Sequence, residues 1–359
     1  MGLLDFLNKS EALIALDIGN SSIKLVELDL GEEKPTLVNI GISALNEEVF
    51  SNNAISKTEQ VSEKISALLE ANAISDRRIV TAMPGPSVFT KKIKMPKQDP
   101  AELRANIQFE ASNFIPHSTE AVRLDYHIIG ESGKNQLDIL VVAVKNEIID
   151  SFMEALALAG LEAAVVDVDY FALQNMFEIS YPELVDETVA LINMGARYSS
   201  INICKETSSL FTGDMAVGGK LFVDAVSEGL GITSQEAEQL IRSKDKKSAQ
   251  YEAARELIDQ NVEYVASEFN RQLSFFWNAS GDEEGIDRIM ICGGGALIPG
   301  LLEEISEKTG IETQIIDPFR GVECGEGVDP GYVKELGALM GVAVGLGLRQ
   351  PGDKIMLEY

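Results

Sequence analysis

A short polar turn near the start of the chain carries side chains that suit phosphate chemistry. Asp17 and Lys24 flank this turn, at the facing ends of two apolar runs, residues 13–18 and 23–28. The turn itself consists of Gly19, Asn20, Ser21 and Ser22. Glycine lets backbone N–H groups approach an anion closely, and the small side chains and one ammonium group add donors. The stretch therefore predicts a hairpin that binds phosphate, with the carboxylate suited to Mg²⁺; an ordinary surface hairpin is the alternative.

Residues 189–204 repeat this plan. Asn193 stands where Asp17 stands in the first stretch, and Gly195 stands where Gly19 stands. Internal duplication of a phosphate hairpin predicts two similar α/β halves whose turns face each other across a cleft. The second turn adds three candidate phosphate ligands, Gly195, Ala196 and Arg197.

A third stretch, residues 288–301, runs from an apolar strand through glycines to the start of a helix. Bare backbone at such a point lets a flat base or a ribose lie against the chain. The residues concerned are Gly293, Gly294, Gly295 and Ala296.

These three stretches, in this order, resemble the actin, sugar kinase and Hsp70 ATPase superfamily. Within it the chain is similar to the type IV pilus assembly PilM family, which is related to the cell-division protein FtsA. Residues 81–96, 110–129 and 141–175 carry the pattern that separates this family from actin and sugar kinases. The resemblance covers almost the whole chain. It implies an actin-like (ribonuclease H-like) α/β fold of two domains, with a duplicated core around a nucleotide cleft and an inserted 1C-type subdomain.

Domain boundaries follow from this resemblance and from the Pro-Gly-Pro turn at residues 84–86, which is typical of a boundary. After that turn the pattern predicts strand, helix, strand, strand and helix. The expected divisions are subdomain 1A at residues 1–82 and 157–188, inserted subdomain 1C at 83–156, subdomain 2A at 189–215 and 286–349, subdomain 2B at 216–285, and a C-terminal tail at 350–359.

The resemblance also implies bound ATP and Mg²⁺, with Asp17 and Asn193 at the metal. The connection between the halves carries a polar group that orients the attacking water, and Asp167 and Asp169 are the candidates; a helix cap is the alternative role. Asn193 replaces an aspartate that is common in actin, so we expect any ATPase activity to be slow.

Helices at the position of residues 234–242 contribute acidic and basic side chains to the ribose and adenine, according to the same resemblance. Glu238 and Arg242 lie four residues apart on one face of the helix predicted there. The alternative is an exposed ion pair worth about 0.3–0.5 kcal/mol. Lys220, which follows a pair of glycines, is a weaker candidate ligand.

Composition excludes several other functions. The formal charge of −27 argues against sequence-independent binding to nucleic acid and against electrostatic docking on an anionic membrane. His117 and His127 are the only histidines, and no nucleophile motif accompanies them, so His-based catalysis is not expected. The three cysteines are too few and too scattered for a disulfide framework or a metal site.

We expect no membrane-spanning helix, because no apolar run approaches the roughly 20 residues that one requires. Residues 1–10 contain four large apolar side chains that suit a weak membrane or partner contact. A frayed terminus is the alternative that we favour, because so short a helix is marginal in water.

Family resemblance finally implies a role. The chain would be a cytoplasmic scaffold at the inner face of the inner membrane, in the machinery of twitching motility. A short cytoplasmic N-terminal peptide of PilN would dock in a groove between subdomain 1C and the nucleotide-binding core, linking the chain to the inner-membrane pilus assembly complex. An FtsA-like filament-forming protein and a small-molecule kinase of the same superfamily are the alternatives.

Overall fold

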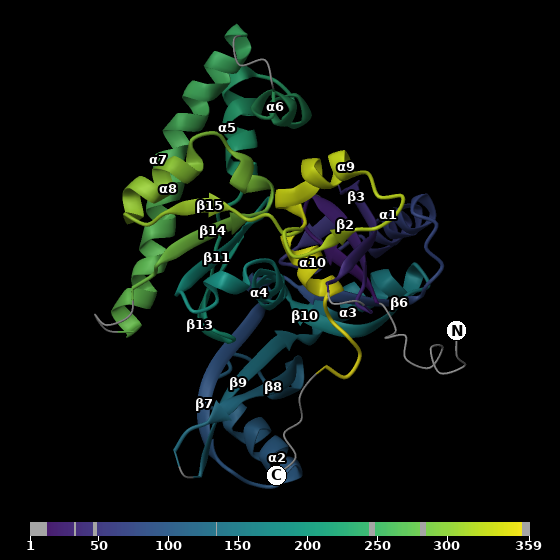
Figure 1. Cartoon of the computed structure of the whole chain (residues 1–359), viewed down its shortest axis with the longest axis vertical. Coiled ribbons are helices and arrows are strands. Elements are labelled where there is room, and N and C mark those ends of the chain that lie inside the picture. The colour runs from purple at the N-terminus through teal and green to yellow at the C-terminus, as the bar shows by residue number, and fades with distance from the viewer. Residues whose placement is uncertain are drawn as a thin grey trace.

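Two sheets of matching topology form the centre of the molecule (Figure 1). The computed structural model describes residues 13–31, 34–45, 49–133, 135–243, 248–280 and 285–353. The first sheet has the strand order β10-β6-β1-β2-β3-β16. Its strands are β1 (Ile14–Ile18), β2 (Ser22–Asp29), β3 (Thr36–Ala44), β6 (Arg78–Met83), β10 (Glu162–Val168) and β16 (Glu323–Cys324).

The second sheet has the order β13-β12-β11-β14-β15. Its strands are β11 (Val189–Met194), β12 (Ser199–Lys205), β13 (Ser208–Met215), β14 (Arg288–Cys292) and β15 (Thr313–Ile315). In each sheet three strands pair antiparallel and are followed by two parallel neighbours, β3-β2-β1-β6-β10 in the first and β13-β12-β11-β14-β15 in the second. The predicted duplicated α/β fold is confirmed by this match.

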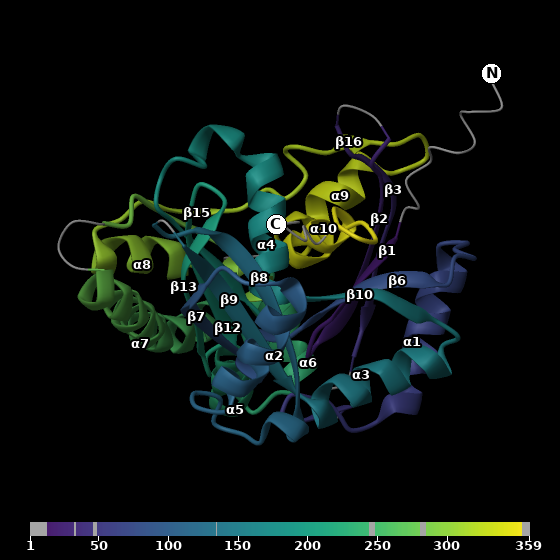
Figure 2. The same ribbon diagram turned by 90° about the horizontal axis from the view of Figure 1, so that it is seen from below.

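Two helices, α4 (Asp169–Ser180) and α10 (Gly341–Gly347), lie between the sheets (Figure 2). α10 packs on β1 and β2, α4 packs on β11 and β12, and the two helices pack on each other. A methyl group added at Gly345 would lie 1.7 Å from the carbonyl oxygen of Ala172, so only glycine permits this approach. The apolar core around these helices contains side chains from both sheets, among them Val26 and Leu191.

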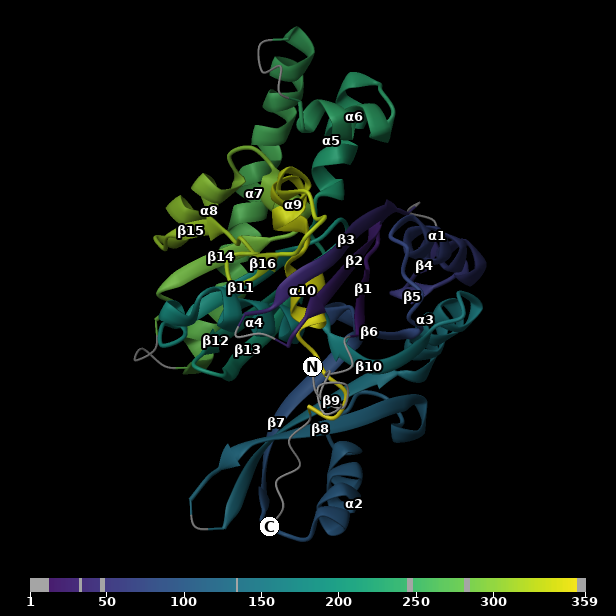
Figure 3. The same ribbon diagram turned by 45° about the vertical axis from the view of Figure 1, so that its right-hand side comes forward.

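Other helices cover the outer faces of the sheets (Figure 3). Beside the first sheet lie α1 (Thr58–Ala71), α3 (Asn146–Leu158) and the short hairpin of β4 (Phe50–Ser51) and β5 (Ala54–Ile55). Beside the second sheet lie α5 (Lys220–Leu230), α6 (Ser234–Ile241), α7 (Ala249–Ser280) and α8 (Leu301–Thr309). The apolar faces of α1 and α7, which the sequence predicts, are the faces that enter these cores.

A small subdomain interrupts the first domain and lies at the lower end of Figure 1. It begins with a short turn, η2 (Gly85–Ser87), and contains an antiparallel sheet of order β7-β9-β8. Its strands are β7 (Val88–Pro96), β8 (Val122–Glu131) and β9 (Gln136–Lys145); its helix is α2 (Pro100–Ala111), and η3 (Thr119–Ala121) precedes β8. Two small apolar clusters hold these elements together, separate from the larger cores.

Two segments lie elsewhere than the predicted divisions place them. The predicted insert, residues 83–156, includes α3, but Ile148 and Phe152 of α3 pack in the core of the first sheet. The sequence shows that this helix is amphipathic and does not show which sheet its apolar face meets. The insert as a packed unit therefore ends near Lys145.

The C-terminal helices also differ from the prediction, which assigns residues 286–349 to the second domain. β16 pairs with β3 of the first sheet, and α10 packs on β1. α9 (Pro330–Leu336) and η6 (Gly337–Leu339) lie between them in the chain. The chain thus returns to the first domain after β15, because the apolar side chains of α10 are buried against strands of that domain.

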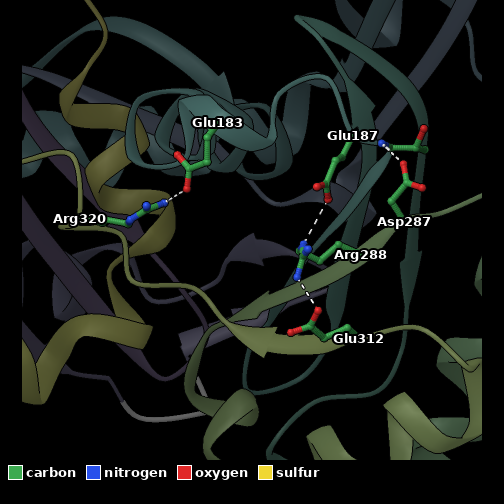
Figure 4. A network of polar contacts seen from close by, with 7 residues as sticks. Glu183, Glu187, Asp287, Arg288, Glu312 and Arg320 are labelled. Carbon is green, nitrogen blue, oxygen red and sulfur yellow. Dashed lines mark hydrogen bonds and ion pairs between the residues drawn. The ribbon is translucent and has the colours of Figure 1, made fainter.

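A polar network holds the connection between the two domains (Figure 4). After α4 the chain crosses to β11 through η4 (Pro182–Leu184). Arg320 pairs with Glu183, and its guanidinium group lies 4.8 Å from the ring centre of Tyr181. Arg288 bridges two carboxylates, with Nε 3.2 Å from Glu187 and Nη1 2.7 Å from Glu312.

Among the helices of the described ranges, none has the length and apolar character that crossing a membrane requires.

Candidate nucleotide-binding site

The first hairpin presents its charged pair at the turn. Asp17 of β1 is the cross-strand partner of Lys24 of β2, and Lys24 Nζ donates to Asp17 Oδ2 at 2.8 Å. Both side chains are largely buried, at 16% and 14% exposure. The N–H of Gly19 donates to the carbonyl oxygen of Ser22 at 3.0 Å, and this bond closes the turn. A methyl group on Gly19 would lie 3.5 Å from Lys24 Nζ, so the ammonium group lies at the turn itself.

The second hairpin has the same geometry without the ion pair of Asp17 and Lys24. The N–H of Gly195 donates to the carbonyl oxygen of Tyr198 at 3.0 Å, as Gly19 does to the residue three positions later in the first turn. Asn193 pairs across the strands with Ser200, in the register that Asp17 and Lys24 occupy in the first hairpin. The duplication therefore extends from the sequence pattern to the backbone of the turns.

Two further glycine turns close on the second hairpin. Gly293 has φ +89, and a methyl group there would lie 2.3 Å from the carbonyl oxygen of Met194. A methyl group on Gly218 would lie 2.5 Å from the carbonyl oxygen of Ala196, and the N–H of Gly219 donates to Gly195 at 2.9 Å. Side chains at these positions would separate the turns, so glycine allows the bare backbone of three segments to meet.

η5 (Gly294–Leu297) brings the third glycine stretch near α6. Arg242 Nη2 lies 3.9 Å from the position of a methyl group on Gly294. Arg242 also pairs with Glu238 at 2.8 Å, and both side chains are about half exposed. The structure therefore brings these predicted base and ribose ligands together beside the glycine turn. Lys220, by contrast, pairs with Asp224 on its own helix at 2.8 Å.

Asp169 begins α4 between the two hairpins. Its side chain is 4% exposed, and its Oδ2 accepts a hydrogen bond from the Ser200 hydroxyl at 3.2 Å. Oδ1 has no hydrogen-bond partner among the described residues. Burial raises the pKa of Asp169 to about 7; the backbone of Gly85 opposes that rise and the charge of Asp17 adds to it.

Asp167 lies two residues earlier in a different setting. Its Oδ2 is 3.2 Å from Nε of Arg349, which follows α10. Burial raises its pKa and the charge of Arg349 lowers it. The structure therefore separates the two predicted water-orienting candidates: Asp169 faces the hairpins, and Asp167 faces the C-terminal end of α10.

Three side chains of this region are absent from the sequence prediction. Tyr198 and Ser200 belong to the second hairpin, and Asp214 of β13 pairs across the strands with Ser200. Burial raises the pKa of Tyr198, and the charges of Asp169, Asp17 and Asp214 add to that rise. Ser200 has the position in the second hairpin that Lys24 has in the first. Sequence reasoning overlooks this equivalence, because it appears only when the two hairpins are aligned beyond their turns.

The donor set can be tested against Mg²⁺. Within the described residues no group of three or more His, Cys, Asp or Glu side chains is arranged to hold a metal ion. Mg²⁺ commonly keeps several waters and takes one or two carboxylates together with phosphate oxygens. Asp17, the Asn193 amide and the unpartnered oxygen of Asp169 fit that pattern only if phosphates and water supply the remaining ligands.

Comparison with solved structures shows the same fold in other proteins. The chain is similar to a PilM-PilN type IV pilus biogenesis complex, with a TM-score of 0.82 and 24% identity, over 94% of this chain and 98% of that chain. It is also similar to ethanolamine utilization protein EutJ from Carboxydothermus hydrogenoformans (TM-score 0.58, 14% identity, 94% and 89% covered). A third match is MreB 5 of Spiroplasma citri bound to AMPPNP (TM-score 0.53, 13% identity, 93% and 94% covered).

The fold is thus actin-like, and the predicted family can be tested over the full length. The model of the family "Type IV pilus assembly protein PilM" matches residues 15–351, which include both hairpins, the insert and the third glycine stretch. The chain therefore belongs to the type IV pilus assembly protein PilM family.

Proposed function

We propose that this chain is an ATP-binding scaffold of the type IV pilus machinery, which holds Mg-ATP between its two hairpins and binds the N-terminal cytoplasmic peptide of PilN. The paired turns carry the proposal. Two glycine turns of identical hydrogen bonding stand on matching strands of two sheets, and the first presents a carboxylate and an ammonium group 2.8 Å apart. Backbone N–H groups and one cation suit phosphates, and the carboxylate suits the associated metal.

Each side chain then has a role toward the nucleotide. Lys24 would exchange its partner Asp17 for a phosphate oxygen, and Asp17 would turn to Mg²⁺, directly or through water. Asn193 would complete the metal environment from the second hairpin. Glu238 and Arg242 would lie along the ribose and base, beside the bare backbone of Gly294. Bound Mg²⁺ would supply charge neutralisation at the phosphates.

Asp169 is the favoured group for holding the attacking water. A pKa of about 7 leaves this carboxyl able to accept a proton at neutral pH, and its Oδ2 meets Ser200 of the second hairpin. Asp167 is already paired with Arg349. Because Asn193 supplies an amide where a second carboxylate would strengthen the metal site, we expect binding to be easier to detect than hydrolysis.

A cavity at the junction of the insert and the first domain supports the peptide site. Its volume is about 420 Å³. The Asn146 side-chain amide donates to the Glu120 carbonyl at 2.8 Å, and its buried oxygen has no partner in the described part of the chain. Asn146 nevertheless lines the cavity, where its polar side chain would meet a bound peptide. The lining residues are His117, Ser118, Ala121, Lys145, Asn146 and Glu147.

One titration tests both parts. Purified protein is titrated with a synthetic PilN N-terminal peptide, with and without Mg-ATP, while released phosphate is measured. We expect peptide binding with little phosphate release, and we expect Asp17→Ala to abolish the Mg²⁺-dependent part of the nucleotide affinity. Wild-type affinity in that variant would overturn the site assignment. Rapid turnover without peptide binding would instead favour another ATPase or a kinase of the same fold.

A further inference from the structure

One side of α7 carries two exposed aromatic side chains. The helix runs along the outer side of the second domain (Figure 1). Its apolar face, which includes Phe269 and Leu273, is buried in the core of that domain. Tyr264 and Phe275 lie on the other side of the helix, at 52% and 49% exposure. Aromatic side chains are enriched at protein–protein contacts, so this side of α7 is a candidate contact surface.

An ion pair lies between the two rings along the helix. Arg271 Nη2 lies 2.7 Å from Glu268 Oε2, and the guanidinium group of Arg271 lies 5.8 Å from the ring centre of Phe275. At 3.6 residues per turn, the two rings and the two charges fall within about 60° of the helix circumference. They form one stripe in the order aromatic, acid, base, aromatic. We call these four residues the α7 stripe: Tyr264, Glu268, Arg271 and Phe275.

The spacing of the α7 stripe makes it complementary to itself. The two aromatic residues are 11 positions apart, the two charged residues are three positions apart, and both pairs share the same midpoint along the helix. When two antiparallel helices are related by a two-fold axis through that midpoint, each residue meets the one that lies equally far on the other side of it. Tyr264 of one copy then faces Phe275 of the other. Glu268 likewise faces Arg271.

We propose that the α7 stripe is the contact surface of a symmetric dimer, in which two copies of this chain pack α7 against α7 in antiparallel orientation. The symmetry doubles each contact, giving two aromatic pairs and two ion pairs between the copies. Opposite charges meet in this orientation, whereas a parallel pair in register would bring like charges together. One helix from each copy buries less surface than a standard interface, so we expect weak association with a Kd of about 10–100 µM.

The charge of the whole chain sets the conditions of the test. A net charge of −27 on each copy opposes association when salt is low. In 0.15 M NaCl the Debye length is about 8 Å, so the pairs within the contact outweigh repulsion between distant carboxylates. Sedimentation velocity of the full chain at this salt concentration, over protein concentrations on either side of the expected Kd, should show a monomer–dimer equilibrium. Neither a nucleotide nor a peptide is required, so the test is independent of the proposed function.

Two charge reversals test the pairing itself. Glu268→Arg gives a stripe with two positive groups, and Arg271→Glu gives a stripe with two negative groups. Because like charges then face each other, each variant alone should dimerise at least about tenfold more weakly than the wild type. A mixture of the two variants places a positive stripe against a negative one, and we expect it to dimerise about as well as the wild type. A variant that merely folds badly would gain nothing from mixing.

Glu256→Arg is the matched control. It makes the same charge change at an exposed position of α7 outside the stripe, and its Kd should stay within about twofold of the wild-type value. A wild type that stays monomeric would overturn the inference. Dimers that persist in both charge-reversal variants would also overturn it, because the contact would then lie on another surface. A mixture of the two variants that stays monomeric would exclude the antiparallel pairing.

Discussion

Lys24 Nζ lies 2.8 Å from Asp17 Oδ2 across the first hairpin, so the proposed phosphate ligand and the proposed metal ligand neutralise each other. Lys24→Met keeps the aliphatic stem and removes the charge. Loss of a charge-assisted hydrogen bond should cost about 1.5–3 kcal/mol, which weakens ADP and AMPPNP binding roughly 10- to 100-fold, both with Mg²⁺ and with EDTA. Titration calorimetry measures this. Lys205→Met, at the end of β12, is the control. Equal nucleotide affinities in the two variants would show that Lys24 does not bind the nucleotide.

Asp169 should make stability depend on pH. Its folded-state pKa of about 7 lies above the ordinary 3.8, so between roughly pH 4 and 7 the folded state keeps a proton that the unfolded state releases. Stability contributed by the neutral carboxyl is therefore lost as pH rises through that window, by at most about 4 kcal/mol. Asp169→Asn removes this slope.

Chemical denaturation at several pH values checks the prediction. As the pH rises from 4 to 7.5, the wild type should lose stability relative to Asp169→Asn. Asp150→Asn, at an exposed carboxyl that pairs with Arg123, provides the comparison. Parallel curves for wild type and Asp169→Asn would show that Asp169 ionises normally.

Gly345→Ala should be strongly destabilising. The added methyl group would lie 1.7 Å from the backbone oxygen of Ala172, and no side-chain rotation relieves a clash with backbone. Overpacking of a core usually costs about 1–3 kcal/mol, and we expect at least the upper value here. Gly337→Ala meets no atom within 4 Å and should change the thermal midpoint little. Similar midpoints for both variants would contradict the close packing of α10 on α4.

Arg288 should contribute a modest, salt-sensitive stabilisation to the domain connection shown in Figure 4. A double-mutant cycle with Glu187→Gln and Arg288→Gln isolates the pair from other effects of each change. Because both groups are partly exposed, we expect a coupling energy of about 1 kcal/mol in low salt that falls in 0.5 M NaCl. A coupling that is unaffected by salt would indicate that packing rather than charge holds Arg288.

Local sequence patterns predict most of the helices and strands. They do not determine which distant elements pack against one another. The two apolar runs around the turn at residues 19–22 and the repeat at residues 189–204 predict both hairpins, and Asn193 has in the second hairpin the position that Asp17 has in the first. The helical periodicity of α3 was also visible. The sequence pattern assigns this helix to the insert, whereas Phe152 packs against the first sheet, because an apolar face does not identify the surface that buries it.

Site residues show the same division. Glycine-rich stretches are easy to recognise in the sequence and predict places where the backbone is approached closely. The structure does bring Gly195, Gly219 and Gly293 together. The sequence alone does not show whether Asp167 or Asp169 faces the hairpins. Their neighbours, Arg349 and Ser200, lie far along the chain, and only the fold brings each one to its carboxylate.

The insert has an apolar core of its own, built from side chains of β7, β9 and α2 such as Met95, Ile139 and Leu103. A unit with a separate core is able to open locally while the shared core around α4 and α10 stays folded. Such opening has a free energy below that of global unfolding. A partner seated at the seam beside Asn146 would shift this local equilibrium toward the closed form. Binding of the proposed peptide would then also protect the insert from proteolysis.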